Sequence, residues 1–122
     1  VNVGADAIVV SNHGGRQLDG AASSIAALPA IVDAVGDKTE VWMDGGIRTG
    51  QDILRAVALG ARGTLIGRAF LYGLGAGGRE GVTRVLEILH KELDLTMALC
   101  GRSKLSEVDD SILLKQTGPA RP

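Results

Sequence analysis

Three short apolar runs divide the chain, and between them the apolar residues recur every three or four positions. The runs are Ala7–Val10, Val41–Met43 and Thr64–Ile66. None of them alternates apolar with polar residues, which indicates strands that are buried on both faces of a parallel sheet. We therefore expect three parallel strands that start near residues 7, 41 and 63.

The stretches between the runs predict helices. One apolar helical face extends over residues 25–35, and another, over 49–60, is opened by a threonine and closed by a glycine. A glycine-rich segment, 69–78, then precedes a long amphipathic helix over 80–99. This alternation of strands and helices is typical of a parallel α/β fold. Three strands would leave both sheet edges unpaired, so the pattern favours part of either an open doubly wound sheet or an eight-stranded barrel.

Length and composition restrict the possibilities further. The 122 residues fit one domain, for which we expect a folded part over 1–114 and a flexible tail over 115–122. The net charge of −1 argues against a general nucleic-acid binder, and the single cysteine excludes a disulfide within the sequence. No cluster has metal-ligand spacing, and no stretch is long and apolar enough to span a bilayer. The chain opens on valine, with a strand almost at once, so we expect the natural protein to extend further at this end.

The first candidate site is the segment 11–19, which directly follows a predicted strand, where α/β proteins gather their functional groups. His13 could act as a general acid or base, and Arg16 offers a planar fork that suits a carboxylate. The alternative is that His13 bonds a loop carbonyl while Arg16 forms a surface ion pair. Each residue alone favours that alternative, but both together on a glycine-bearing loop favour a site.

Two further turns follow the second and third predicted strands. The turn 44–48 (DGGIR) could present glycine amides and a helix N-terminus to an anion, while Asp44 could accept bonds from sugar-like hydroxyls. The alternative is a tight turn with a solvated Arg48. In barrels the loops after the last two strands frequently bind phosphate, and Gly67–Arg68 would be the second of these loops. This agreement favours a barrel over an open sheet and predicts that two arginines, Arg48 and Arg68, converge on one phosphate. An ion pair with a neighbouring carboxylate is the alternative for Arg68.

The segment 11–19, with the sequence SNHGGRQLD, resembles the signature of the FMN-dependent 2-hydroxy acid dehydrogenases and oxidases. The resemblance continues through DGGIR at 44–48, ALGA at 58–61 and IGRAFLYG at 66–73, and it reaches about residue 114. The first motif is highly specific, whereas the later ones recur in other FMN barrels. Within the family, the chain is most similar to the bacterial L-lactate dehydrogenases.

The resemblance implies the C-terminal portion, about strands six to eight, of a (β/α)₈ TIM barrel with FMN as its cofactor. It implies oxidation of an L-2-hydroxy acid, L-lactate above all, to the 2-oxo acid. His13 would be the catalytic base, and His13 and Arg16 would bind the substrate. The implied cofactor-binding residues are Ser11, Asp44, Gly45, Gly46, Ile47, Arg48, Gly67 and Arg68.

The resemblance also implies partners for this chain. The N-terminal part of the barrel would supply the other half of the active site, and the intact enzyme would be a cytoplasmic homotetramer, or one peripheral at the inner membrane. The electron acceptor stays open between oxygen, a quinone and a cytochrome. One alternative is a barrel fragment without catalysis that keeps phosphate binding or an assembly role, and we expect the isolated chain to be inactive. Another is a nucleotide dehydrogenase, but the catalytic cysteine loop expected there is missing.

Overall fold

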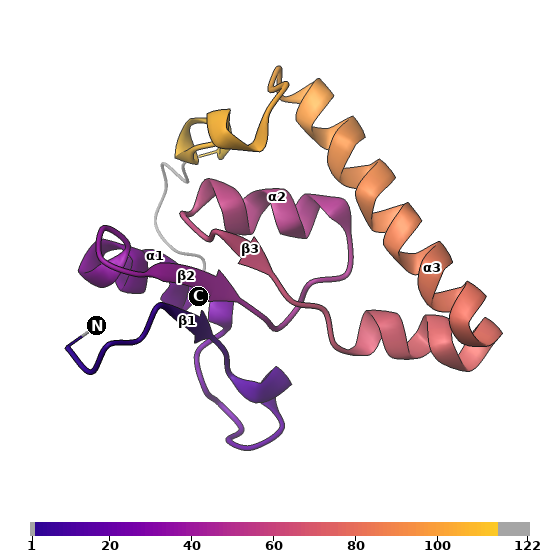
Figure 1. The fold of residues 1–122 in the computed structure, drawn as a ribbon, viewed down its shortest axis with the longest axis horizontal. Coiled ribbons are helices and arrows are strands. Elements are labelled where there is room, and N and C mark those ends of the chain that lie inside the picture. Colours follow the sequence, from indigo (N-terminus) through magenta and orange to yellow (C-terminus); the bar gives the residue numbers. More distant parts are fainter. Residues whose placement is uncertain (1, 115–122) are drawn as a thin grey trace, which may run out of the picture.

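In the computed structural model, which describes residues 2–114, three parallel strands form one sheet (Figure 1). They are β1 (Ala7–Val10), β2 (Glu40–Met43) and β3 (Gly63–Thr64), in the order β1-β2-β3. Val9 pairs with Trp42, and Trp42 pairs with Gly63. The predicted parallel sheet is confirmed, although β3 is shorter than its apolar run. One more bond, from the Leu65 N–H to the Met43 carbonyl at 2.9 Å, ends the pairing before the chain turns away.

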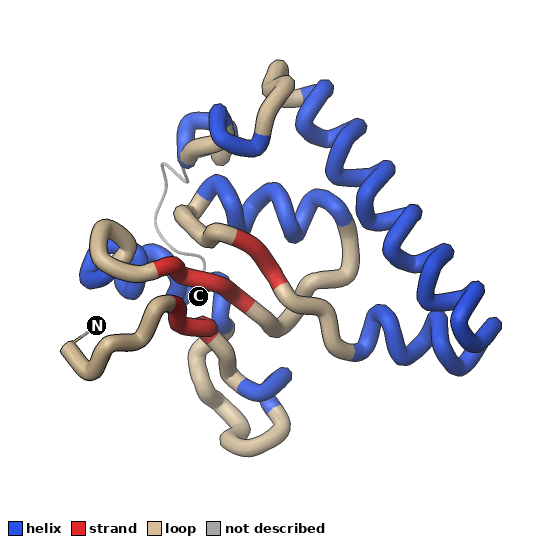
Figure 2. The backbone as a smooth tube through the Cα atoms, in the orientation of Figure 1, coloured by secondary structure: helices blue, strands red, loops and turns tan. Residues whose placement is uncertain are grey.

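The expected helices α1 (Ser24–Val35) and α2 (Gly50–Ala58) connect the strands and pack against the sheet (Figure 2). The core lies between these helices and one face of the sheet; its buried residues are Val10, Leu28, Val41, Met43, Ile47, Ala56 and Ala61. Single 3₁₀ turns occur at His13–Gly15 (η1), Leu105–Glu107 (η2) and Asp110–Ile112 (η3). The predicted tail, 115–122, lies outside the described residues.

The opposite face of the sheet is uncovered among the described residues. Val9 is 51% exposed and Leu65 is 45% exposed, so the expected burial of the strands on both faces is not met within residues 2–114. Within β2 the Trp42 indole N–H donates to a carboxylate oxygen of Glu40 at 3.1 Å, and the ring lies against Gly63. Parallel sheets are normally covered on both faces, so this exposed apolar face is unusual for a parallel sheet.

The helix α3 (Arg68–Leu99) begins earlier than the sequence predicts, because the glycine-rich segment 69–78 is largely helical. Gly77 and Gly78 break the helical geometry, and the first part of α3 folds back against the second (Figure 1). At this crossing a Cβ atom on Gly73 would lie 2.6 Å from the carbonyl oxygen of Gly81. The glycines thus permit two helical segments to touch backbone to backbone, a packing that outweighs their weak helix propensity.

Candidate active site

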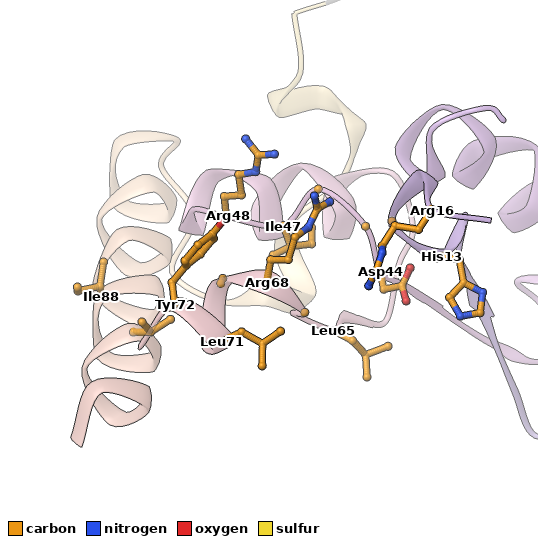
Figure 3. Close-up of a pocket in the computed structure, with 16 residues that line it drawn as sticks. His13, Arg16, Asp44, Ile47, Arg48, Leu65, Arg68, Leu71, Tyr72 and Ile88 are labelled. Atoms are coloured by element: carbon orange, nitrogen blue, oxygen red, sulfur yellow. The ribbon is translucent and has the colours of Figure 1, made fainter. Parts of the chain in front are cut away.

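The turns that follow β1, β2 and β3 meet around one cavity of about 670 Å³ (Figure 3). The expectation that segments 11–19, 44–48 and 67–68 share one end of the sheet is therefore confirmed. Nine of the predicted site residues line this cavity: His13, Arg16, Asp44, Gly45, Gly46, Ile47, Arg48, Gly67 and Arg68. Ser11 is not part of the wall, and its hydroxyl oxygen accepts the His13 N–H at 3.1 Å.

The first turn has an unusual backbone that presents two polar side chains. His13 has a φ angle of 58°, and the next two glycines have φ angles of 67° and 71°. A left-handed conformation is costly for a residue with a Cβ atom, and such strain tends to collect at functional sites. The side chains of His13 and Arg16 are exposed and form no hydrogen bond or ion pair within residues 2–114. The carbonyl bond and ion pair considered as alternatives are thus absent from this part of the chain.

The second turn places a carboxylate and two glycines on the cavity wall. Gly45 and Gly46 have φ angles of 86° and 81°, which explains why glycine occupies both positions. One carboxylate oxygen of Asp44 is buried without a hydrogen-bond partner in the described structure. Ile47 is 5% exposed and its side chain belongs to the core, so its backbone is what it offers to a ligand.

The N-terminus of α2 does not serve an anion as the sequence suggested. Asp52 accepts the N–H groups of Arg48 and Thr49 at 3.1 and 3.0 Å, and Glu92 of α3 accepts that of Gly50 at 2.9 Å. Burial of Asp52 raises its pKa, but the hydrogen bonds from Arg48 and Thr49 together with nearby Arg55 outweigh this effect and hold the pKa below its usual value. The protein's own carboxylates therefore use the positive end of this helix.

The N-terminus of α3 is open instead. Its first turn has no side-chain cap, and Gly67 precedes it with free space where a Cβ atom would be. The guanidinium of Arg68 reaches the loop after β1, where its Nη2 atom lies 3.6 Å from the position of a Cβ atom on Gly14. Neither Arg48 nor Arg68 has an ion-pair partner in the part of the chain that the structure describes.

The sequence did not indicate the apolar side of the cavity. Leu65 after β3 and Leu71, Tyr72, Val85 and Ile88 of α3 complete the wall. Val85 lies in the amphipathic helix that the sequence predicts over 80–99, and the folding back of α3 brings it to the cavity. Within residues 2–114, no group of three His, Cys, Asp or Glu side chains could hold a metal ion, and no helix is long and apolar enough to cross a membrane.

A family model described as FMN-dependent dehydrogenase matches residues 1–115. The chain belongs to this family. The L-lactate dehydrogenase of Caulobacter vibrioides is 54% identical over 115 residues, which are 94% of this chain and 30% of that protein. The L-lactate oxidase of a Nostoc species is 58% identical over 113 residues, 93% of this chain and 31% of the oxidase.

Solved structures show the same relationship. Mandelate oxidase with benzoyl-formic acid matches with a TM-score of 0.85 and 48% identity, over 88% of this chain and 32% of the oxidase. A soluble mutant of the membrane-associated (S)-mandelate dehydrogenase from Pseudomonas putida matches with a TM-score of 0.87 and 43% identity, over 91% of this chain and 31% of the other. The chain thus has the α/β fold of FMN-dependent TIM-barrel enzymes and spans about a third of the length of these proteins.

The cofactor of the family is FMN, as the sequence motifs predicted, and the cavity has the chemistry to receive it. A phosphate needs N–H donors and positive charge, which the glycine turns, the open N-terminus of α3 and two unpaired arginines provide. A ribityl chain needs acceptors for its hydroxyl groups, and the unpartnered oxygen of Asp44 is one. The residues present therefore fit the cofactor.

Proposed function

We propose that this chain forms strands six to eight of a (β/α)₈ barrel that oxidises an L-2-hydroxy acid, L-lactate above all, to the 2-oxo acid. The observation that carries the proposal is one cavity that is lined by unpaired His13 and Arg16 from the turn after β1 and by unpaired Arg48 and Arg68 from the turns after β2 and β3. The first pair suits a hydroxy carboxylate, and the second suits a phosphate.

The sheet supports the barrel. Its strand order β1-β2-β3 follows the chain without the reversal that marks the switch point of an open doubly wound sheet. Within residues 2–114 helices cover one face only, and Val9 and Leu65 are exposed on the other. Closure with five more strands would bury that face as the barrel interior and would pair both edges.

The substrate groups act at the first turn. The exposed guanidinium of Arg16 holds the substrate carboxylate with two parallel hydrogen bonds, which fixes the position of the C2 hydroxyl. A neutral His13 imidazole then accepts the hydroxyl proton. Bound FMN would supply the acceptor for the two electrons and the C2 hydrogen that leave the hydroxy acid, so the products would be the 2-oxo acid, reduced FMN and a protonated His13. The absent part of the barrel contributes the remaining wall of the substrate site.

The cofactor groups act at the other turns. The unpartnered oxygen of Asp44 would accept hydrogen bonds from ribityl hydroxyls, and the backbone of Gly45 to Ile47, on the same cavity wall, would border the ribityl chain. The Gly67 amide and the guanidinium groups of Arg48 and Arg68 would hold the phosphate. Ser11 keeps a hydroxyl proton to donate to the flavin, because its oxygen already accepts the His13 N–H.

The test is anaerobic mixing of the whole flavoprotein with L-lactate while flavin reduction is followed by absorbance. We expect His13→Gln to slow this reduction by about 10²–10⁴-fold with the FMN content unchanged, because the general base is lost. The matched control is His90→Gln, which alters the other histidine, exposed on α3. Normal flavin reduction by His13→Gln would remove the role of His13, and no reduction by any L-2-hydroxy acid would remove the proposed function.

A further inference from the structure

The turn that carries His13 and Arg16 belongs to a long exposed loop that forms few hydrogen bonds with the rest of the protein. Residues 15–23 are all exposed, including Leu18 at 69%, so no apolar side chain anchors the loop to the core. Within the described structure, every hydrogen bond from residues 14–22 to a residue outside that segment is made with Asn12 or His13. The hydrogen bonds that hold this loop are therefore concentrated at Asn12 and His13.

Asn12 joins the two ends of this loop. Its side-chain amide donates to the Ala22 carbonyl at 3.3 Å, and its backbone N–H donates to the hydroxyl oxygen of Ser24 at 3.2 Å. Its own carbonyl oxygen accepts the Gly15 N–H at 3.0 Å, which closes the turn around His13. Ser24 is 4% exposed and is the first residue of α1, so the attachment leads to a rigid element.

Asn12 also lies against the turn 44–48, which is called the cofactor turn here because we propose that it borders FMN. Its side-chain oxygen would be 3.2 Å from a Cβ atom on Gly45, and the Ser24 hydroxyl oxygen would be 3.0 Å from it. The Asn12 oxygen is buried and has no hydrogen-bond partner in residues 2–114, whereas the amide nitrogen is engaged. The contact therefore sets the distance between the loop of His13 and the turn of Asp44 to Arg48.

We propose that Asn12 is a positioning residue that fixes His13 and Arg16 relative to the cofactor turn. It does not touch the cavity, since it is absent from the wall, so it acts through the backbone of its neighbours. The strained φ angle of His13, 58°, persists because both polar groups of the peptide that precedes it are held: the Ser11 hydroxyl accepts the His13 N–H, and the Asn12 carbonyl accepts the Gly15 N–H. The role of Asn12 in catalysis rests on the proposed function, whereas its hold on the loop does not.

The test uses the whole flavoprotein with Asn12→Ala and Asn12→Asp. The aspartate has nearly the shape of asparagine but cannot donate to the Ala22 carbonyl. If Asn12 only fills space, Asn12→Asp should behave like the parent protein. If its amide acts as a donor, Asn12→Asp should behave like Asn12→Ala. The matched control is Asn2→Ala at the only other asparagine, which is exposed. Hydrogen exchange of the amides in residues 14–22 and the anaerobic rate of flavin reduction by L-lactate are measured for each variant.

We expect both Asn12 variants to exchange faster in residues 14–22 than the parent and the control. Flavin reduction per bound FMN should fall by roughly 10²-fold, the usual cost of a misplacement near 1 Å, with KM for L-lactate raised and FMN retained. Unchanged exchange in this segment, or lost FMN with a normal reduction rate, would overturn the proposal. If the parent protein reduces its flavin with no 2-hydroxy acid, the proposed function fails, and the exchange data still decide whether Asn12 holds the loop.

Discussion

The carboxylate of Glu92, in the long part of α3, accepts a hydrogen bond of 2.9 Å from the backbone N–H of Gly50, the first residue of α2. The two helices approach so closely that a Cβ atom on Gly50 would overlap the backbone of Leu93. Asp52 accepts the N–H groups of the two preceding residues, Arg48 and Thr49, so the two carboxylates together cap the N-terminus of α2. An anion in the cavity is therefore left to the glycine turns and to α3.

Glu92→Ala should destabilise the protein by about 1–3 kcal/mol, because it leaves the Gly50 N–H unpaired in a partly buried position. Glu92→Gln keeps an oxygen acceptor and should cost less. Chemical denaturation of the whole protein measures both. Glu87→Ala is the control, since Glu87 is exposed and forms a surface ion pair with Arg84. Equal effects of Glu87→Ala and Glu92→Ala would contradict the capping role.

Arg68→Ala should weaken FMN binding by roughly 10–100-fold, as expected for the loss of a hydrogen bond of about 1.5–3 kcal/mol to a charged group. The affinity for riboflavin, which has no phosphate, should not change, and this comparison isolates the phosphate. Titration of the apoprotein followed by flavin fluorescence gives both constants. Arg79→Ala, at an exposed position of α3, is the control. A parallel loss of riboflavin affinity would assign Arg68 to another part of the cofactor.

Asp52 makes stability depend on pH in the acid range. Its pKa is lowered in the folded protein, so its stabilising effect is fully present above the unfolded value of 3.8 and is lost as the pH falls through the folded value. Asp52→Asn should therefore lower the free energy of unfolding by about 1 kcal/mol at neutral pH. The difference from the parent should vanish in more acid solution. Denaturation curves across this range test it, with exposed Asp94→Asn as the control, and a difference that persists in acid would refute it.

Gly81→Ala should destabilise the protein by about 1–3 kcal/mol, because the new Cβ atom would overlap the carbonyl oxygen of Gly73 where α3 folds back. Gly75→Ala in the same helix meets nothing within 4 Å and should be neutral or slightly stabilising. Thermal unfolding of the two variants compares them directly. Similar melting temperatures would show that α3 does not keep its close crossing in solution.

Much of the site could be predicted from the sequence, because each chemical group comes directly after an apolar run. Parallel strands place their carboxyl ends at one edge, so the turns at 11–19, 44–48 and 67–68 had to meet once the runs were strands. The helical period likewise located α1 and α2. These features depend on neighbours within a few residues of one another.

Tertiary structure decided the rest, because it depends on contacts between distant residues. Nothing near Gly50 in the sequence indicates that Glu92, 42 positions later, accepts its N–H, so that this amide is not free to bind an anion. Glycines at 73, 77, 78 and 81 are equally compatible with a loop. In the structure Gly77 and Gly78 break the helix, and the backbone contact of Gly73 with Gly81 packs the two helical parts together and brings Val85 to the cavity. The sequence motif identified His13 as a candidate site residue. The hydrogen bonds of Asn12 to Ala22 and Ser24, which connect the two ends of its loop, are visible only in the structure.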